Sequence, residues 1–172
     1  MARLAGDREI AANTLTVPHP YDEDMAEAWI AGHEGAFADG TRAIFAVVER
    51  STGELVGTVG LVIAREQGRA ELGYWIGRPY WDRGYCTEAA REVVRHAFEA
   101  LALHRVYAHH FTRNPASGRV MQKLGMRHEG RLRGHVCKWG VFEDIEVYGV
   151  LAEEARPGGE PGPGSAPPPP AP

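Results

Sequence analysis

One segment carries most of the structural information in this sequence: Gly73-Tyr74-Trp75-Ile76-Gly77-Arg78-Pro79-Tyr80-Trp81-Asp82-Arg83-Gly84-Tyr85-Cys86-Thr87-Glu88-Ala89. It is predicted to form a strand, a loop and the first turn of a helix. Such a turn directs several backbone N–H groups to one spot beside the positive end of the helix dipole, where an anion binds. Gly84 lets a ligand approach the backbone closely, and Arg83 adds positive charge. A plain tight connection explains a single glycine equally well. The segment contains neither GK[ST] nor GxGxxG, so it predicts neither a Walker A loop nor a dinucleotide-binding turn.

The elements on either side of this segment indicate an α+β fold. The helix after the loop is expected from Thr87 to about Ala102, because its apolar residues recur at the spacing of a helix that lies on a sheet. Before the segment we expect one helix that Asp22 caps and Gly40 ends, with Met25, Ala28, Trp29 and Ala36 at helical intervals. Strands are expected at Ala43–Glu49, Leu55–Ala64 and Ala70–Gly77. After it we expect a strand at Arg105–Phe111, a helix at Pro115–Leu124 capped by Asn114 and Gly125, and strands at Arg131–Trp139 and Val141–Leu151. This order predicts a mixed, mostly antiparallel sheet with helices on both faces.

Composition divides the chain into a domain and a tail. The 172 residues are 44% hydrophobic, which suffices for one globular domain at residues 1–155. Residues 156–172 hold eight of the 12 prolines. This tail cannot bury enough apolar surface to offset its ordering entropy, so it is expected to be disordered, with a short polyproline II run at Pro167–Pro170.

Charge and residue usage exclude several classes of protein. A formal net charge of −4 argues against a protein that mainly binds nucleic acid or anionic membranes. No apolar run is long enough to span a membrane and no signal peptide is evident, so a cytoplasmic location is expected. Cys86 and Cys137 are expected to be free thiols. The eight histidines form no metal-binding motif, and no metal is expected.

Several motifs in a fixed order resemble the GNAT superfamily of N-acetyltransferases, and more narrowly its RimJ/RimL-like branch. They lie within about residues 5 to 152. They comprise Val17-Pro18-His19-Pro20-Tyr21, Glu71-Leu72-Gly73-Tyr74-Trp75-Ile76, Trp81–Ala89, Asn114-Pro115-Ala116-Ser117, Lys123-Leu124-Gly125-Met126, Glu129-Gly130 and Asp144. The resemblance implies a GNAT fold in which the strand ending at Ile76 and the strand from Arg105 splay apart. It also implies acetyl-CoA as the co-substrate.

The resemblance assigns acetyl-CoA to particular residues. The pyrophosphate is expected on the backbone amides of Arg83, Gly84, Tyr85, Cys86 and Thr87. The pantetheine arm is expected to lie along the splayed strand at Trp75 and Ile76, where a backbone N–H is also expected to stabilise the oxyanion. Asn114 and Ser117 are expected near the pantetheine and the thiol.

The catalytic residues are less evident. Many members of the superfamily protonate the leaving thiolate with a tyrosine, but the matching position here is Met121. Ser117 is the better candidate for that task, although helix capping or contact with CoA accounts for it equally well. Strand alternation places Glu71 on one face with Gly73 and Trp75, so Glu71 is a candidate base, directly or through water; an exposed strand charge is the alternative. His109, His110 and Asp144 are weaker candidates, and activation of the amine by water alone is also open.

The resemblance implies an N-acetyltransferase that transfers acetyl from acetyl-CoA to a primary amine, by direct attack in a ternary complex. The acceptor is either a protein N-terminus or a small-molecule amine. The main alternative is a non-catalytic acyl-CoA-binding or regulatory module, because the tyrosine is missing and Val136 stands where some relatives have a glutamate. A nucleotide-binding protein ranks third. Relatives begin with one further strand, for which this chain has no room. Preceding residues or another subunit, as in a homodimer, would cover that sheet edge.

Overall fold

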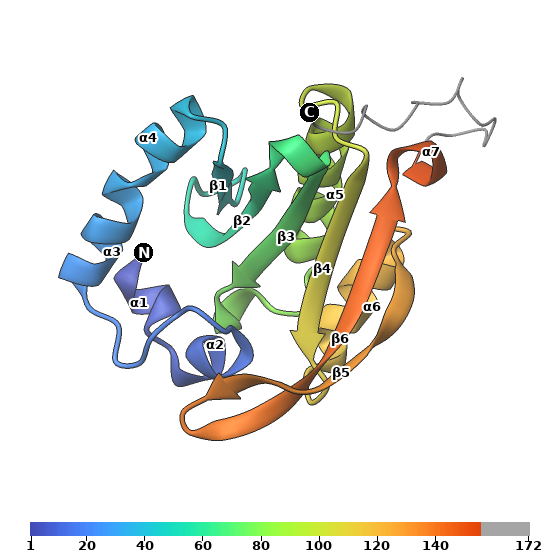
Figure 1. Ribbon diagram of the computed structural model, residues 1–172. Coiled ribbons are helices and arrows are strands. Elements are labelled where there is room, and N and C mark those ends of the chain that lie inside the picture. Colours follow the sequence, from blue (N-terminus) through green and yellow to red (C-terminus); the bar gives the residue numbers. More distant parts are fainter. Residues whose placement is uncertain (156–172) are drawn as a thin grey trace.

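A six-stranded sheet forms the centre of the computed structural model, which describes residues 1–155 (Figure 1). The expected disorder and polyproline II run of residues 156–172 lie outside the described part. The strand order is β1-β2-β3-β4-β6-β5. The strands are β1 (Arg42–Val48), β2 (Leu55–Ala64), β3 (Arg69–Ile76), β4 (Arg105–Phe111), β5 (Arg127–Lys138) and β6 (Val141–Leu151). Every neighbouring pair is antiparallel except β3 and β4, which confirms the predicted mixed sheet.

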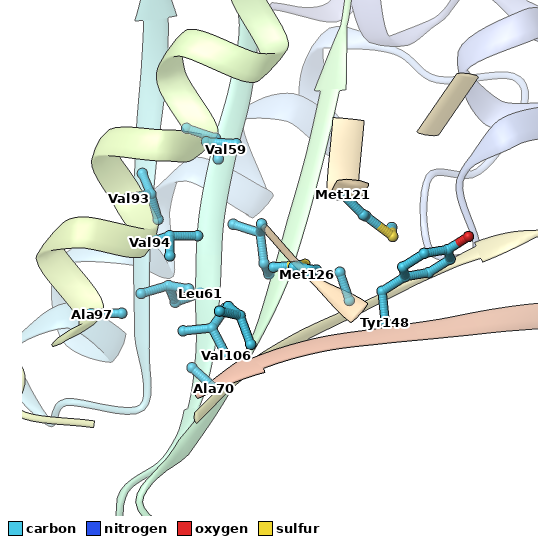
Figure 2. Close-up of a cluster of buried hydrophobic side chains, with 14 of the residues drawn as sticks. Val59, Leu61, Ala70, Val93, Val94, Ala97, Val106, Met121, Met126 and Tyr148 are labelled. Atoms are coloured by element: carbon cyan, nitrogen blue, oxygen red, sulfur yellow. The ribbon is translucent and has the colours of Figure 1, made fainter. Parts of the chain in front are cut away.

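Helices cover both faces of this sheet, as predicted. The larger apolar core lies under α5 (Tyr85–Glu99) and α6 (Pro115–Lys123), where Val93, Val94 and Ala97 of α5 pack with Leu61 of β2 (Figure 2). On the opposite face, α1 (Ala2–Ala5) and α2 (Arg8–Asn13) pack around Trp75. The remaining elements are α3 (Glu23–Ala31), α4 (His33–Ala38), α7 (Ala152–Ala155) and the short 3-10 turns η1 (Arg65–Gln67) and η2 (Arg78–Tyr80).

The two middle strands separate part of the way along, as the resemblance implied. β3 and β4 pair in parallel over three positions only, Arg69 with Arg105, Ala70 with Val106 and Glu71 with Tyr107. Beyond Glu71, β3 still pairs with β2 as far as Ile76, and β4 still pairs with β6 as far as Phe111. The edge of β3 that faces β4 therefore has free backbone groups from Leu72 onward, and these can bind an extended ligand.

Three local predictions were inexact. The single helix predicted between Asp22 and Gly40 is two helices, α3 and α4, which meet at Gly32; Asp22 does cap the first. Met25 is exposed and Ala26 is the buried residue, because the helix faces α1 rather than the sheet. β5 starts earlier than predicted and contains two register shifts, which periodicity does not reveal.

Residues 2–13 form two short helices, and β1 is an edge strand of the sheet within residues 1–155. Among those residues no helix is both long enough and apolar enough to cross a membrane. Cys86 and Cys137 are free, as predicted.

Candidate functional site

A cavity of about 480 Å³ opens where β3 and β4 separate. Its floor is the face of the sheet that carries Gly60, Gly73 and Glu71, and Ser117 at the start of α6 closes one side. Residues 13–18 and Trp29 of α3 form the outer wall. A Cβ built on Gly73 would meet nothing within 4 Å, so the floor is open at its centre. The cavity thus lies between the splayed strands β3 and β4 and the wall formed by residues 13–18 and α3.

The loop before α5 leaves its backbone amides free, as an anion-binding loop requires. Gly84 is the N-cap of α5 and has a left-handed backbone with φ of +86°. Within residues 1–155, the backbone amides from Asp82 to Thr87 donate to no protein acceptor. A Cβ on Gly84 would meet nothing within 4 Å, so there is room for a ligand above the loop. Unpaired amides at the start of a 15-residue helix suit a phosphate group.

Side chains hold this loop in place on both sides. Trp81 Nε1 donates to the carbonyl oxygen of Ile76 at 2.6 Å. The Tyr85 hydroxyl donates to Glu49 on the turn after β1, and this hydrogen bond lowers the pKa of Glu49. The Arg83 guanidinium lies 5.8 Å from the centre of the Tyr80 ring. Tyr85 therefore offers its amide to a ligand, while its side chain anchors the loop.

The sheet register shows which amides of β3 face the gap. Gly77 N donates to Val56 O at 2.8 Å, so Trp75, two residues earlier, also has its amide turned toward β2. The amides of Tyr74 and Ile76 point the other way, into the gap. Of the two positions expected to donate to an oxyanion, Ile76 has the available N–H. The Trp75 side chain packs against Leu4 and Ile10 and lines the cavity.

Ser117 lies in the first turn of α6 and is bonded to a tyrosine that sequence analysis did not single out. The Tyr74 hydroxyl is 2.9 Å from Ser117 Oγ and 3.2 Å from Ser117 O. Asn114 caps α6 by accepting from Ser117 N at 3.4 Å, as predicted. Burial raises the pKa of Tyr74, and the neighbouring Cys86 adds to this effect. Tyr74 is therefore a neutral hydrogen-bond donor. No sequence signal indicates this pairing, because it joins residues 43 positions apart.

Glu71 lies on the cavity floor beside two partners from β4. His109 Nδ1 is 3.3 Å from Glu71 Oε1, and the Tyr107 hydroxyl donates to Glu71 Oε2 at 3.3 Å. His110, next along β4, is buried and stacked on Tyr148 with ring centres 5.7 Å apart. The structure thus brings Glu71 and His109 together.

Met121, Asp144 and Cys86 occupy positions that do not suit them to catalysis. Met121, at the position where the resemblance implies a tyrosine, is buried in the core and also lines the cavity. Asp144 accepts a hydrogen bond from Gly134 N in the β5–β6 hairpin and does not line the cavity. Burial raises the pKa of the Cys86 thiol to about 12, so this residue is a poor nucleophile. Among residues 1–155, no three His, Cys, Asp or Glu side chains are grouped to hold a metal.

Known proteins resemble this chain in sequence and in fold. The family described as the acetyltransferase (GNAT) domain matches residues 1–127. The uncharacterized N-acetyltransferase YoaA of Bacillus subtilis is 39% identical over 106 residues, which are 61% of this chain and 60% of YoaA. The [ribosomal protein uS5]-alanine N-acetyltransferase of Escherichia coli is 23% identical over 121 residues, 69% of this chain and 62% of that protein.

A solved structure agrees over a longer stretch. The crystal structure of a GNAT-family acetyltransferase from Bacillus anthracis has a TM-score of 0.79 and 25% identity, and covers 90% of this chain and 88% of that one. The sequence match spans about three fifths of the curated relatives' own length. With the splayed strands and the loop before α5, these likenesses show that the chain belongs to the GNAT acetyltransferase family.

Proposed function

We propose that this protein transfers an acetyl group from acetyl-CoA to a primary amine, by direct attack within a ternary complex. The observation that carries the proposal is the order of groups along β3. The amide cradle of residues 82–87 follows its C-terminal end, free amides lie at Ile76 and Tyr74, and the Glu71 carboxylate lies further back. An anion, an extended arm and an amine would meet these groups in that order.

The residues present suit acetyl-CoA. The cradle at Arg83, Gly84, Tyr85, Cys86 and Thr87 offers unpaired amides and open space for a pyrophosphate. The gap edge of β3 offers N–H groups for the amide carbonyls of pantetheine, as an added strand would use them. When bound, acetyl-CoA supplies a reactive thioester. The protein must then bind the amine, accept its proton, stabilise an oxyanion and protonate a thiolate.

Glu71 is proposed as the group that binds the ammonium and accepts its proton, directly or through water. Its carboxylate lies at the cavity floor, where an acceptor amine would meet it. His109 donates from Nδ1 to Glu71 in the proposed arrangement, which orients the carboxylate and leaves Nε2 as a basic nitrogen. The Tyr107 hydroxyl holds the second carboxylate oxygen. Glu71 and His109 Nε2 are therefore the two proposed acceptors of the amine's proton.

Ser117 is proposed to donate a proton to the departing thiolate, with Tyr74 as its positioning residue. When the Tyr74 hydroxyl donates to Ser117 Oγ, the serine proton is turned away from the tyrosine and is available to the gap. The positive end of α6 also favours a nearby thiolate. The Ile76 amide is proposed to stabilise the oxyanion. Met121 has no proton to give, so the neighbouring serine takes over this task.

Release of free CoA thiol from acetyl-CoA, measured over a panel of primary amines, tests the proposal. We expect turnover with at least one amine. Glu71→Gln should lower kcat/KM by about a hundredfold and leave the acetyl-CoA Kd within about twofold, since general base catalysis contributes roughly that much. Binding of acetyl-CoA with no turnover of any amine would instead support a non-catalytic acyl-CoA-binding module.

A further inference from the structure

A single row of side chains crosses the cavity floor from β1 to β3. Arg42 is paired with Val62 across β1 and β2, and Val62 is paired with Glu71 across β2 and β3. Directly opposite residues of neighbouring strands project from the same face of the sheet. All three side chains line the same cavity. The floor therefore presents, in order, a guanidinium, an apolar side chain and a carboxylate.

The guanidinium at one end of the row has no partner within the described residues. No carboxylate pairs with Arg42 and no hydrogen bond involves its side chain in residues 1–155. Burial and the positive charge of Arg42 lower the pKa of the nearby His33, so this histidine adds no second charge. By contrast, Glu71 at the other end has His109 and Tyr107 on its far side. An incoming ligand would give Arg42 an anionic partner that residues 1–155 do not supply.

Val62 separates the two charged ends and is itself unusually open. The Val62 side chain is 51% exposed although its strand lies inside the sheet, because it faces the open cavity and no helix of residues 1–155 packs on it. Two strand spacings separate the Cα atoms of Arg42 and Glu71 by about 10 Å. A short methylene chain laid over Val62 would cover this apolar surface and place one charged group at each end of the row.

We propose that the acceptor is an amine that also carries a carboxylate or a phosphate at the far end of a short chain. This assignment rests on the acetyl transfer proposed above and names the acceptor class. Glu71 binds the ammonium end, Val62 contacts the chain, and Arg42 binds the anionic end in a two-point contact. A diamine of the same length would place its second ammonium against Arg42. The cavity therefore selects against polyamines by repulsion as well as for amino acids by attraction.

Three amines of matched length test whether the far end of the acceptor is anionic, neutral or cationic. 5-Aminopentanoate, pentylamine and 1,5-diaminopentane have an anionic, a neutral and a cationic far end. We expect wild-type kcat/KM to favour 5-aminopentanoate over pentylamine by about tenfold or more, as for a hydrogen bond to a charged group, and to disfavour the diamine. A fourth amine, 3-aminopropyl phosphate, shows whether the anion is a phosphate or a carboxylate.

Variants of Arg42 test the residue itself. Arg42→Gln should bring 5-aminopentanoate and pentylamine to similar kcat/KM values, and Arg42→Glu should reverse the order in favour of the diamine. Arg91→Glu is the matched control. It makes the same change in net charge on an exposed residue of α5, on the opposite face of the sheet, and should leave the ratios unchanged.

The outcomes distinguish this inference from the proposed function. Equal turnover of the three amines by wild type, unchanged in Arg42→Glu, overturns the inference and leaves acetyl transfer standing. If no amine is acetylated although acetyl-CoA binds, the proposed function fails. The inference is then judged by calorimetry with the CoA-bound protein: 5-aminopentanoate must bind at least tenfold more tightly than pentylamine, and Arg42→Glu must abolish that difference.

Discussion

Replacing Gly84 with alanine isolates the contribution of the left-handed backbone before α5. The φ of +86° costs an L-residue about 1–2 kcal/mol, and the open space around the built Cβ adds no steric penalty. Alanine also restricts the unfolded chain, which offsets about 0.4–1 kcal/mol. A net cost of about 1 kcal/mol remains. If the loop of the ligand-free variant keeps its shape, this cost lowers the free energy of unfolding. If that loop relaxes, the cost is met on binding and weakens acetyl-CoA binding about fivefold.

Gly84→Glu imposes the same backbone strain as Gly84→Ala and also places a negative charge in the loop. A carboxylate about 4 Å from a phosphate charge is repelled by about 1 kcal/mol in water and about 4 kcal/mol near a protein surface. We therefore expect the acetyl-CoA Kd to rise by at least about fivefold above that of Gly84→Ala. Isothermal titration calorimetry measures the Kd, and urea unfolding measures the stability of each variant.

Gly140→Ala provides the matched control. Gly140 has a φ of +80°, and its Cβ would also meet open space, but it lies in the β5–β6 turn, away from the loop. Its substitution should cost similar stability and leave the acetyl-CoA Kd unchanged. The assignment of the loop is refuted if Gly84→Glu binds acetyl-CoA within about twofold of wild type.

Three further substitutions or reactions test other parts of the structure. Tyr74→Phe should lower kcat about fivefold with an unchanged acetyl-CoA Kd, since one hydrogen bond is lost; an unchanged kcat would contradict the positioning role. Lys138→Met removes the hydrogen bonds of a buried ammonium to the carbonyl oxygens of residues 15 and 17, which form part of the cavity wall. The KM for the amine and the rate of proteolysis at residues 14–18 should therefore rise, as steady-state kinetics and limited digestion would measure. If neither rises, these hydrogen bonds do not hold the wall. Burial raises the pKa of the Cys86 thiol to about 12, so at pH 8 Cys86 should react with iodoacetamide at least a hundredfold more slowly than the exposed Cys137. The rate of Cys86 should rise with pH up to about 12. Peptide mass spectrometry measures both rates, and equal rates at pH 8 would refute the burial of Cys86.

Local patterns in the sequence predicted the elements that position the site. The apolar spacing of α5 identified both the helix and its buried face, which the core around Val93 and Val94 confirms. Asn114 before a proline identified the start of α6, and its side chain caps that helix. These features depend on residues within a few positions of one another, so the sequence displays them directly.

Helix breaks and strand irregularities were harder to predict. Gly32 ends α3 with an ordinary helical backbone, at φ of −77°, so nothing local distinguishes it from a glycine inside a longer helix. The register shifts of β5 depend on its pairing with β6 and not on its own residues. In both cases tertiary packing decided between conformations that the local sequence allows equally.

The amino-acid sequence alone determined the α+β class, the strand-loop-helix segment around Gly84 and the resemblance to the GNAT superfamily. Only the tertiary structure determined which side chains meet in the cavity: Glu71 with His109, Ser117 with Tyr74, and Arg42 in line with Glu71. The physical reason is the range of the interactions. Periodicity and capping act over one or two turns, whereas these groups meet through strand register and the splay of β3 from β4, which the packing of the whole sheet sets.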